Sequence, residues 1–112
     1  MSAATKKRYS FRFLDMTAQQ AADLGKRGSR VKISPGWKKG IVVGVVPLRE
    51  SINYSWIKAF IRKGRISKSK CDIFISIRTD YDTKMLGVPK YVLRIIHDTK
   101  VNITFSFTSI TP

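Results

Sequence analysis

Hydrophobic and polar positions alternate along RYSFRFLD (residues 8–15), close to the start of the chain. A period of two is typical of a strand with one covered face. The covered face would carry the three aromatic residues Tyr9, Phe11 and Phe13. The segment therefore predicts a half-buried strand.

The next segment, TAQQAADLG (17–25), has the signals of a short helix. Thr17 is followed three residues later by Gln20, the spacing of a capping box. Gly25 is a typical residue just after a last helical turn. We expect a helix that begins after Thr17 and ends near Gly25.

A second helix is predicted within SINYSWIKAFIRKG (51–64). Ile52, Trp56 and Phe60 recur every four residues, which predicts an amphipathic helix over about 52–63. Ser51 would cap its start and Gly64 would end it. The aromatic and β-branched residues here also favour a strand, which is the competing interpretation.

The remaining apolar segments predict strands. GIVVGVVPL (40–48) is apolar throughout, which predicts a strand buried on both faces, and Val31 with Ile33 indicates a short strand before it. The last third predicts three strands, joined by a loop over 80–89 and a hairpin turn at HDTK (97–100). Their sequences are CDIFISIRT (71–79), KYVLRIIHD (90–98) and KVNITFSFTSI (100–110).

These elements predict one α+β domain over residues 9–112, with a flexible basic arm at 1–8. The sheet would be mostly antiparallel, with five or six strands and two helices. A chain of 112 residues is long enough for one domain and too short for two. No apolar run approaches the roughly 18 residues that cross a bilayer, and no apolar segment follows the charged N-terminus. We therefore expect no membrane span and no classical secretion signal.

Charge narrows the range of functions. The chain carries 22 Lys and Arg against 7 Asp and Glu, a net charge of +15. Residues 1–70 hold 17 of the bases and three of the acids, while residues 71–112 hold five bases and four acids. Such an uneven excess points to a polyanionic partner. A solvated surface that aids solubility is the alternative.

The basic residues form three stretches interleaved with aromatic residues: 6–12, 26–39 and 58–70. Phosphates bind Lys and Arg, and unpaired bases stack on aromatic rings, so this mixture favours RNA or single-stranded DNA. A membrane surface would use the helix at 52–63 but leaves the other two stretches unexplained. Trp37 lies in a Pro-Gly turn, where we expect its ring to be exposed, and is the stacking candidate, whereas Trp56 fits the apolar face of the helix. The candidate binding residues are Lys26, Arg27, Arg30, Lys32, Trp37, Lys38, Lys39, Lys58, Arg62, Lys63, Arg65, Lys68 and Lys70.

Residues for catalysis or metal binding are scarce. His97 is the only histidine and Cys71 the only cysteine, so neither a zinc site nor a disulfide within the chain is expected. Asp80 and Asp82 could hold Mg²⁺ for phosphoryl chemistry, although loop solubility explains them more simply. Neither of the glycine-rich phosphate-binding motifs G-x-x-x-x-G-K-[ST] and G-x-G-x-x-G occurs. We expect a protein that is not an enzyme and uses no cofactor, metal or small-molecule substrate.

The segment VKISPGWKKGIVVGVV (31–46) resembles the KOW element of small SH3-like barrels in ribosomal proteins and transcription factors. The shared positions are Val31, Ile33, Gly36, Lys39, Gly40, Val43 and Val45. Gly44 follows Gly40 by four residues, whereas family members usually have a spacing of three. This resemblance implies RNA contact through the loop at 36–40.

The last third resembles the central strands of small RNA-bacteriophage coat proteins, through CDIFISIRT, KYVLRIIHD and KVNITFSFTSI in succession. The resemblance implies a dimeric sheet, shell assembly and RNA binding. The two C-terminal helices of that family have no counterpart after residue 110.

The function predicted from the sequence is that of a nucleic-acid-binding structural protein. Our first expectation is a small viral coat protein that self-assembles and packages its genome by electrostatic contacts, located in the virion or the cytoplasm. The alternative is a ribosomal-type or KOW-like RNA-binding protein that acts as a monomer in a ribonucleoprotein.

Overall fold

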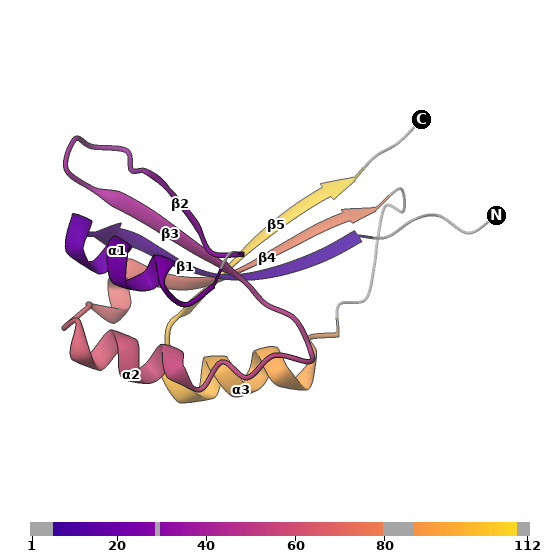
Figure 1. Cartoon of the computed structure of the whole chain (residues 1–112). Helices are drawn as coiled ribbons and strands as arrows, with labels where there is room; N and C mark the ends of the chain where they lie inside the picture. Colours follow the sequence, from indigo (N-terminus) through magenta and orange to yellow (C-terminus); the bar gives the residue numbers. More distant parts are fainter. Residues whose placement is uncertain (1–5, 29, 80–86, 110–112) are drawn as a thin grey trace.

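The computed structural model describes residues 6–28, 30–79 and 87–109. Five strands form one mixed sheet in the order β2-β3-β1-β4-β5 (Figure 1). Neighbouring strands are antiparallel except β4 and β5, which are parallel. The strands are β1 (Lys6–Met16), β2 (Lys32–Pro35), β3 (Val42–Pro47), β4 (Cys71–Thr79) and β5 (Asn102–Ser109).

Three helices form a second layer on one face of this sheet (Figure 1). They are α1 (Ala18–Gly25), α2 (Trp56–Lys63) and α3 (Lys90–Thr99), and one turn of 3₁₀ helix, η1 (Lys68–Lys70), precedes β4. α1 contacts β2 and β3, α2 packs under β1, and α3 is the crossover between the parallel strands β4 and β5. The chain is a single α+β domain with a mostly antiparallel five-stranded sheet and three helices.

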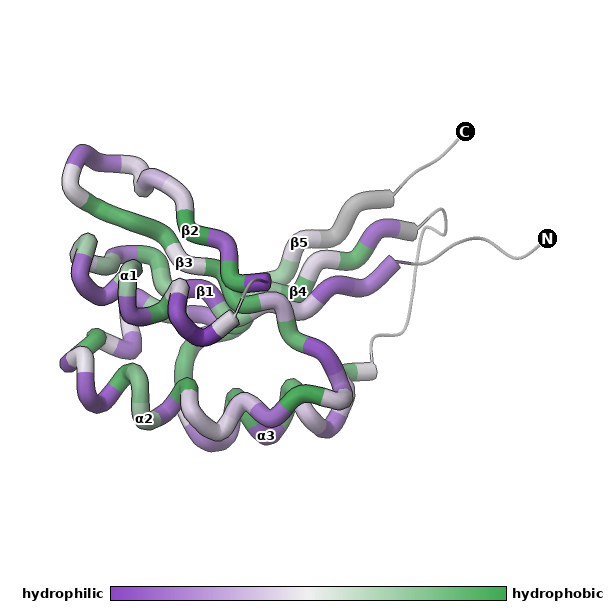
Figure 2. Tube along the Cα trace, in the orientation of Figure 1, coloured by the Kyte–Doolittle hydropathy of each residue, from purple (hydrophilic) through white to green (hydrophobic). Residues whose placement is uncertain are grey.

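The core lies between the two layers and follows the alternation read from the sequence. Phe11 and Phe13 of β1 are fully buried, and Ile73 and Ile75 of β4 lie beside them on the same face. Each helix presents its apolar side to these residues, so hydrophilic and hydrophobic positions mix along α2 and α3 (Figure 2). Burying side chains of this size contributes about 1.5–3 kcal/mol each.

α1 approaches the sheet closely because β3 carries a glycine beneath it. A Cβ added at Gly44 would lie 2.5 Å from Leu24 Cδ2 and 2.6 Å from Met16 Cε. The predicted start of this helix is confirmed: Thr17 Oγ1 accepts from the Gln20 amide, and the Gln20 side chain accepts from the Thr17 amide. The helix ends at Gly25, as expected.

The sheet face without helices carries a polar cluster. Asp72 is buried and accepts hydrogen bonds from Arg12 Nε at 2.8 Å, from Arg12 Nη2, and from Thr104 Oγ1 at 2.7 Å. The Arg12 guanidinium also lies over the Phe74 ring, 4.1 Å from its centroid. Because these residues come from β1, β4 and β5, the cluster links the three adjacent strands.

The largest error in the sequence interpretation concerns residues 90–99. They form helix α3, with Val92, Ile95 and Thr99 buried, and not a strand. The expected hairpin turn at 97–100 is therefore wrong too: it is the end of α3, where Lys100 adopts a left-handed conformation. β5 consequently runs parallel to β4. Of the three consecutive strands that carried the resemblance to coat proteins, the middle one is therefore a helix.

Smaller corrections concern element boundaries. α2 begins at Trp56, not near Ile52, and the side chain that orders its start is Asn53, whose Oδ1 accepts from the Ser55 amide at 2.8 Å. Residues 6–8, expected in the arm, belong to β1, and residues 1–5 lie outside the described residues. β3 is buried on one face only. Most of the loop expected at 80–89, including Asp80 and Asp82, also lies outside the residues that the structure describes.

Candidate nucleic-acid interface

α1 and α2 lie antiparallel beside each other. Gln20, in the first turn of α1, donates from Nε2 to the Gly64 carbonyl at the end of α2, at 2.8 Å. Arg27, just after α1, lies over the ring of Trp56 at the start of α2, 5.1 Å from its centroid. These contacts fix α2 from one side and leave its other side to face α3.

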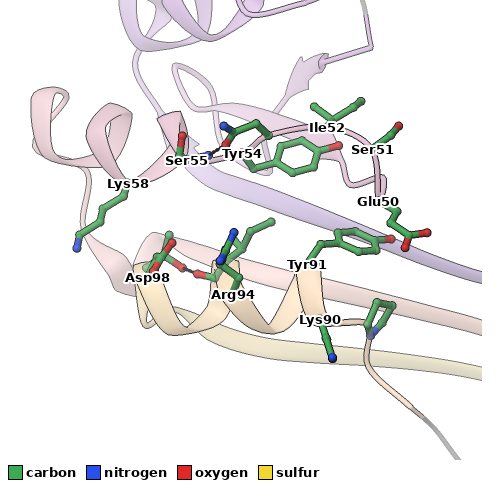
Figure 3. A pocket seen from close by; sticks show the side chains of 14 residues that line it. Glu50, Ser51, Ile52, Tyr54, Ser55, Lys58, Lys90, Tyr91, Arg94 and Asp98 are labelled. Carbon is green, nitrogen blue, oxygen red and sulfur yellow. Dashed lines mark hydrogen bonds between the residues drawn. The ribbon is translucent and has the colours of Figure 1, made fainter.

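A groove runs between α2 and α3. Its wider part, about 920 Å³, is lined by residues 50–55, by Lys58 of α2 and by residues of α3 (Figure 3). Its narrower part, about 410 Å³, continues past Arg62 to Arg65 and Lys68. The two parts share Lys58, Asp98 and Thr99, so they adjoin each other. We call it the α2–α3 groove.

Positive charge comes from both walls of the α2–α3 groove. Lys58 comes from α2, while Lys90 and Arg94 come from α3 (Figure 3). Six basic residues line the groove against two acidic ones. The basic residues are Lys58, Arg62, Arg65, Lys68, Lys90 and Arg94; the acidic ones are Glu50 and Asp98. All six basic residues are exposed.

Helix periodicity sorts the charges of the stretch 58–70. Lys58 and Arg62 are four residues apart and share the face of α2 toward α3. Lys63 does not line the groove. It lies on the same side of α2 as Trp56, which is the side toward α1. Lys70 is turned to the end of β1, where its Nζ lies 2.7 Å from Asp15 Oδ2. In the sequence these residues form one basic stretch. In the fold they face three different elements: α3, α1 and the end of β1.

Arg65 is held in an unusual backbone conformation. Its φ is 52°, in the left-handed region, where Arg65 follows the last turn of α2. A side chain there costs roughly 1–2 kcal/mol, which is why glycine usually occupies this position after a helix. The glycine is present one residue earlier, at Gly64, whose φ is −81°. The chain thus carries an arginine where glycine fits better, and this arginine lines the groove.

The second basic stretch forms a separate surface. β2 and β3 pair as an antiparallel hairpin, with Ile33 opposite Gly44, and Gly40 at φ 90° allows the tight turn between them. Trp37 in this turn is 82% exposed, as the sequence predicted, and Lys38 and Lys39 beside it are exposed. Arg30 and Lys32 are exposed along the same hairpin, whereas Lys26 and Arg27 lie at the end of α1. The two strands predicted between residues 31 and 48 are confirmed as β2 and β3, and they lie in an open sheet.

The first basic stretch lies at the other end of the sheet. Met16 pairs with Val42 at the hairpin end of β1, so Lys6 and Lys7 begin the strand far from the turn at 36–41. Arg12 of this stretch is occupied by Asp72. Among the described bases, ion pairs with described carboxylates are made by Arg12, Lys26 and Lys70.

Sequence reasoning missed one wall of the groove. Lys90, Tyr91 and Arg94 were assigned to a strand, so they were not connected with the basic stretch at 58–70. Tyr91 is half-buried at the wider part, and burial together with nearby Tyr9, Tyr54 and Glu50 raises its pKa. A usable signal was present, because Val92, Ile95, Ile96 and Thr99 follow a helical spacing.

His97 and Cys71, two of the residues considered from the sequence for catalysis or metal binding, lie on different elements, α3 and β4. His97 is exposed on α3 with Nδ1 3.7 Å from Asp98 Oδ1. Cys71 is 1% exposed, and burial followed by the nearby Asp72 carboxylate raises its pKa to about 12 from 9.0, so the thiol is held in its unreactive form. No group of three or more His, Cys, Asp or Glu in the described residues is placed to hold a metal ion. Nor is any described helix long and apolar enough to span a bilayer.

Comparison with known proteins gives no relative: no family model, no curated protein and no solved structure matches this chain.

Proposed function

We propose that the chain binds single-stranded nucleic acid, without catalysing a reaction, in the α2–α3 groove. The observation that carries this proposal is the groove's lining of six exposed basic residues, drawn from both of its walls, against two acidic ones. A polyanion in the groove would contact cations on either side along its path. Neutralising phosphates and releasing their counterions is the main source of such affinity.

A single strand suits this site better than a duplex. The charges line a channel between two helices, and a flexible strand can follow such a channel with its phosphates toward either wall. Tyr91 offers a partly exposed aromatic ring in the wider part, where an unpaired base could contact it. A duplex would instead need an element that enters one of its grooves.

The proposal also explains why so dense a charge is tolerated. Arg62 and Arg65 crowd like charges at the end of α2, and Arg65 adds backbone strain. Neither feature helps the free protein fold. Bound phosphates would relieve the repulsion, so both features are understandable as contributions to binding.

The test compares two double variants that remove the same charge. R62Q/R65Q removes two groove cations, and K63Q/K100Q removes two exposed cations that lie neither in the groove nor on the β2–β3 hairpin. Binding to a fluorescent oligonucleotide without secondary structure is measured at several salt concentrations. We expect R62Q/R65Q to weaken binding about tenfold, at roughly 1 kcal/mol or less per lost contact, and to lower the salt slope by about 1.4. K63Q/K100Q should change the affinity less than threefold.

Two results of this experiment would contradict the proposal. Equal losses in both would mean that binding follows net charge and not the groove. An affinity that does not change with salt would remove the electrostatic basis altogether.

The exposed turn of the β2–β3 hairpin favours a second binding surface, in line with the KOW-like resemblance. Trp37 is the most exposed of the large apolar side chains that the structure describes, and Lys38 and Lys39 flank it. In this candidate function the chain is a monomeric RNA-binding protein that stacks a base on Trp37. Trp37→Ala would then weaken binding more than R62Q/R65Q, at about 1–3 kcal/mol for a stacked base.

The finer form of our proposal is a coat protein that packages its genome. Many copies would then cover one nucleic acid, so the native material should be a large particle with strong absorbance at 260 nm. A monomer that copurifies with ribosomes would instead support the ribosomal-type alternative. Native mass measurement combined with absorbance separates the two.

A further inference from the structure

We propose that two copies of this chain pair through their β5 strands, antiparallel about a two-fold axis at Thr104, into one continuous ten-stranded sheet. This inference concerns the opposite side of α3 from the groove, and it does not depend on nucleic-acid binding. It begins with the two edges of the sheet, β2 and β5.

The two edge strands are protected to different degrees. β2 has only four residues and includes Lys32 and Pro35, and a lysine or a proline on an edge discourages further pairing. β5 has eight residues, NITFSFTS, with no charge and no proline. Half of its amides and carbonyls point away from β4 because successive residues of a strand face opposite edges. β5 is therefore the edge that is open to another strand.

Apolar side chains gather at the same edge. Ile103 is 42% exposed and Phe105 55% exposed, although they pair with the buried residues Ile73 and Ile75 and so lie on the helix-covered face. α3 adds Leu93, which is 49% exposed, and half-buried Ile96. At 3.6 residues per turn, both fall on the flank of α3 opposite Tyr91, Arg94 and Asp98, which face the groove. Three of the six exposed large apolar residues described thus share one edge of the molecule.

A second copy of the chain fits this edge by symmetry. In an antiparallel pair, directly opposite residues lie on the same face. A two-fold axis at Thr104 places Ile103 opposite Phe105 of the other copy, and Phe105 opposite its Ile103. On the other face it places Asn102 opposite Ser106, and Thr104 opposite itself. Every described side chain of β5 from 102 to 106 then meets one of its own kind, apolar with apolar and polar with polar.

Charge favours the same partner and the same edge. Two chains of net charge +15 repel each other, so they can associate only where local charge is low. Residues 71–112 hold five bases and four acids, and residues 101–109 hold none of either. The groove, with its excess of bases, lies on the far side of α3. A dimer built at β5 keeps the two grooves apart while leaving both open.

The first experiment measures association of the free protein by sedimentation equilibrium at several salt concentrations. We expect a dimer whose affinity rises with salt, because screening weakens the repulsion between the chains. Nucleic-acid binding should show the opposite dependence. The two proposals can therefore fail independently. A protein that stays monomeric at high concentration and high salt would overturn the dimer.

The variants compare two isoleucines of equal exposure on the two edge strands. Ile103→Lys should shift the dimer to monomer, with at least a tenfold loss of affinity, since the lysine would lie opposite Phe105. Ile33→Lys, on β2, is the matched control, because Ile33 is 41% exposed and receives the same charge. Equal weakening by both substitutions would mean a general charge effect and would overturn the assignment to β5.

Cross-linking tests the register. Thr104→Cys puts two thiols opposite each other at the axis, where the Cα separation of about 4.5–5.5 Å in an antiparallel pair suits a disulfide. Asn102→Cys is the control, because its two copies would lie about 13 Å apart, at roughly 3.3 Å per residue. The native Cys71 is buried and does not compete. Disulfide formation at Thr104 and not at Asn102 supports the pairing; equal or faster formation at Asn102 overturns it.

Discussion

Arg65 offers a substitution that should improve folding and impair binding at the same time. Its φ of 52° costs roughly 1–2 kcal/mol for a residue with a side chain, and glycine adopts that conformation freely. Glycine also gains about 0.5–1 kcal/mol of entropy in the unfolded chain, which offsets part of the benefit. Arg65→Gly should therefore raise the free energy of unfolding by about 0.5–1 kcal/mol.

The corresponding thermal shift follows from the size of the chain. Unfolding entropy near the midpoint is about 2.1 cal/mol/K per residue, which gives roughly 235 cal/mol/K for 112 residues. A gain of 0.5–1 kcal/mol then raises Tm by about 2–4 °C. Differential scanning calorimetry at neutral pH without nucleic acid resolves a shift of this size.

Lys100 is the matched control. Its φ is 55°, it follows the end of α3, and it is exposed and basic, but it does not line the α2–α3 groove. Lys100→Gly should stabilise the fold by a similar amount. Only Arg65→Gly should weaken oligonucleotide binding, about fivefold at moderate salt, with the salt slope reduced by about 0.7.

Two results would refute this reasoning. If Arg65→Gly binds as tightly as the parent, Arg65 makes no phosphate contact and its strain has no role in binding. If Lys100→Gly loses as much affinity as Arg65→Gly, the loss reflects net charge rather than position in the groove.

Three further predictions concern single sites. Because the pKa of Cys71 is raised from 9.0 to about 12, the unfolded chain loses this proton first as pH rises above about 9; urea unfolding should show stability falling toward pH 12, less steeply in Cys71→Ala. Asp72→Ala should lower the free energy of unfolding by about 2–4 kcal/mol, since it leaves Arg12 and Thr104 without their acceptor, and a decrease below 1 kcal/mol in denaturant titration would contradict the role of this cluster. If the hairpin turn only assists binding, Trp37→Ala should weaken it less than R62Q/R65Q does, with Tm within about 1 °C of the parent because the ring is 82% exposed.

Local sequence signals correctly predicted those elements that are specified by residues only a few positions apart in the chain. The capping box at Thr17 and Gln20 needs only three residues, and it formed as expected. The alternation of β1 was equally reliable, because Phe11 and Phe13 face the core whatever covers it. Both patterns depend on backbone geometry and little on tertiary context.

α3 was missed for a physical reason. KYVLRIIHDT is rich in β-branched residues, which favour strands, and its helical spacing competes with that preference. Tertiary packing favours the helix, because Val92, Ile95 and Thr99 are buried as one face where the segment crosses between parallel strands. A crossover of this kind usually carries a helix. The error in one element also reversed the direction of β5 and concealed one wall of the groove.

The position of α3 connects the two proposals. On one flank, Arg94 and Asp98 face α2 across the groove; on the other, Leu93 and Ile96 extend the apolar edge of β5. A chain of charge +15 cannot bring copies of itself together through its basic surfaces, and it cannot hold a phosphate chain in an apolar edge. Because the two flanks of α3 differ in this way, nucleic-acid binding and pairing of two chains can use separate surfaces. If both proposals hold, a dimer would present two grooves on the same face of one sheet, and a strand long enough to reach both would be bound more tightly than two separate short strands.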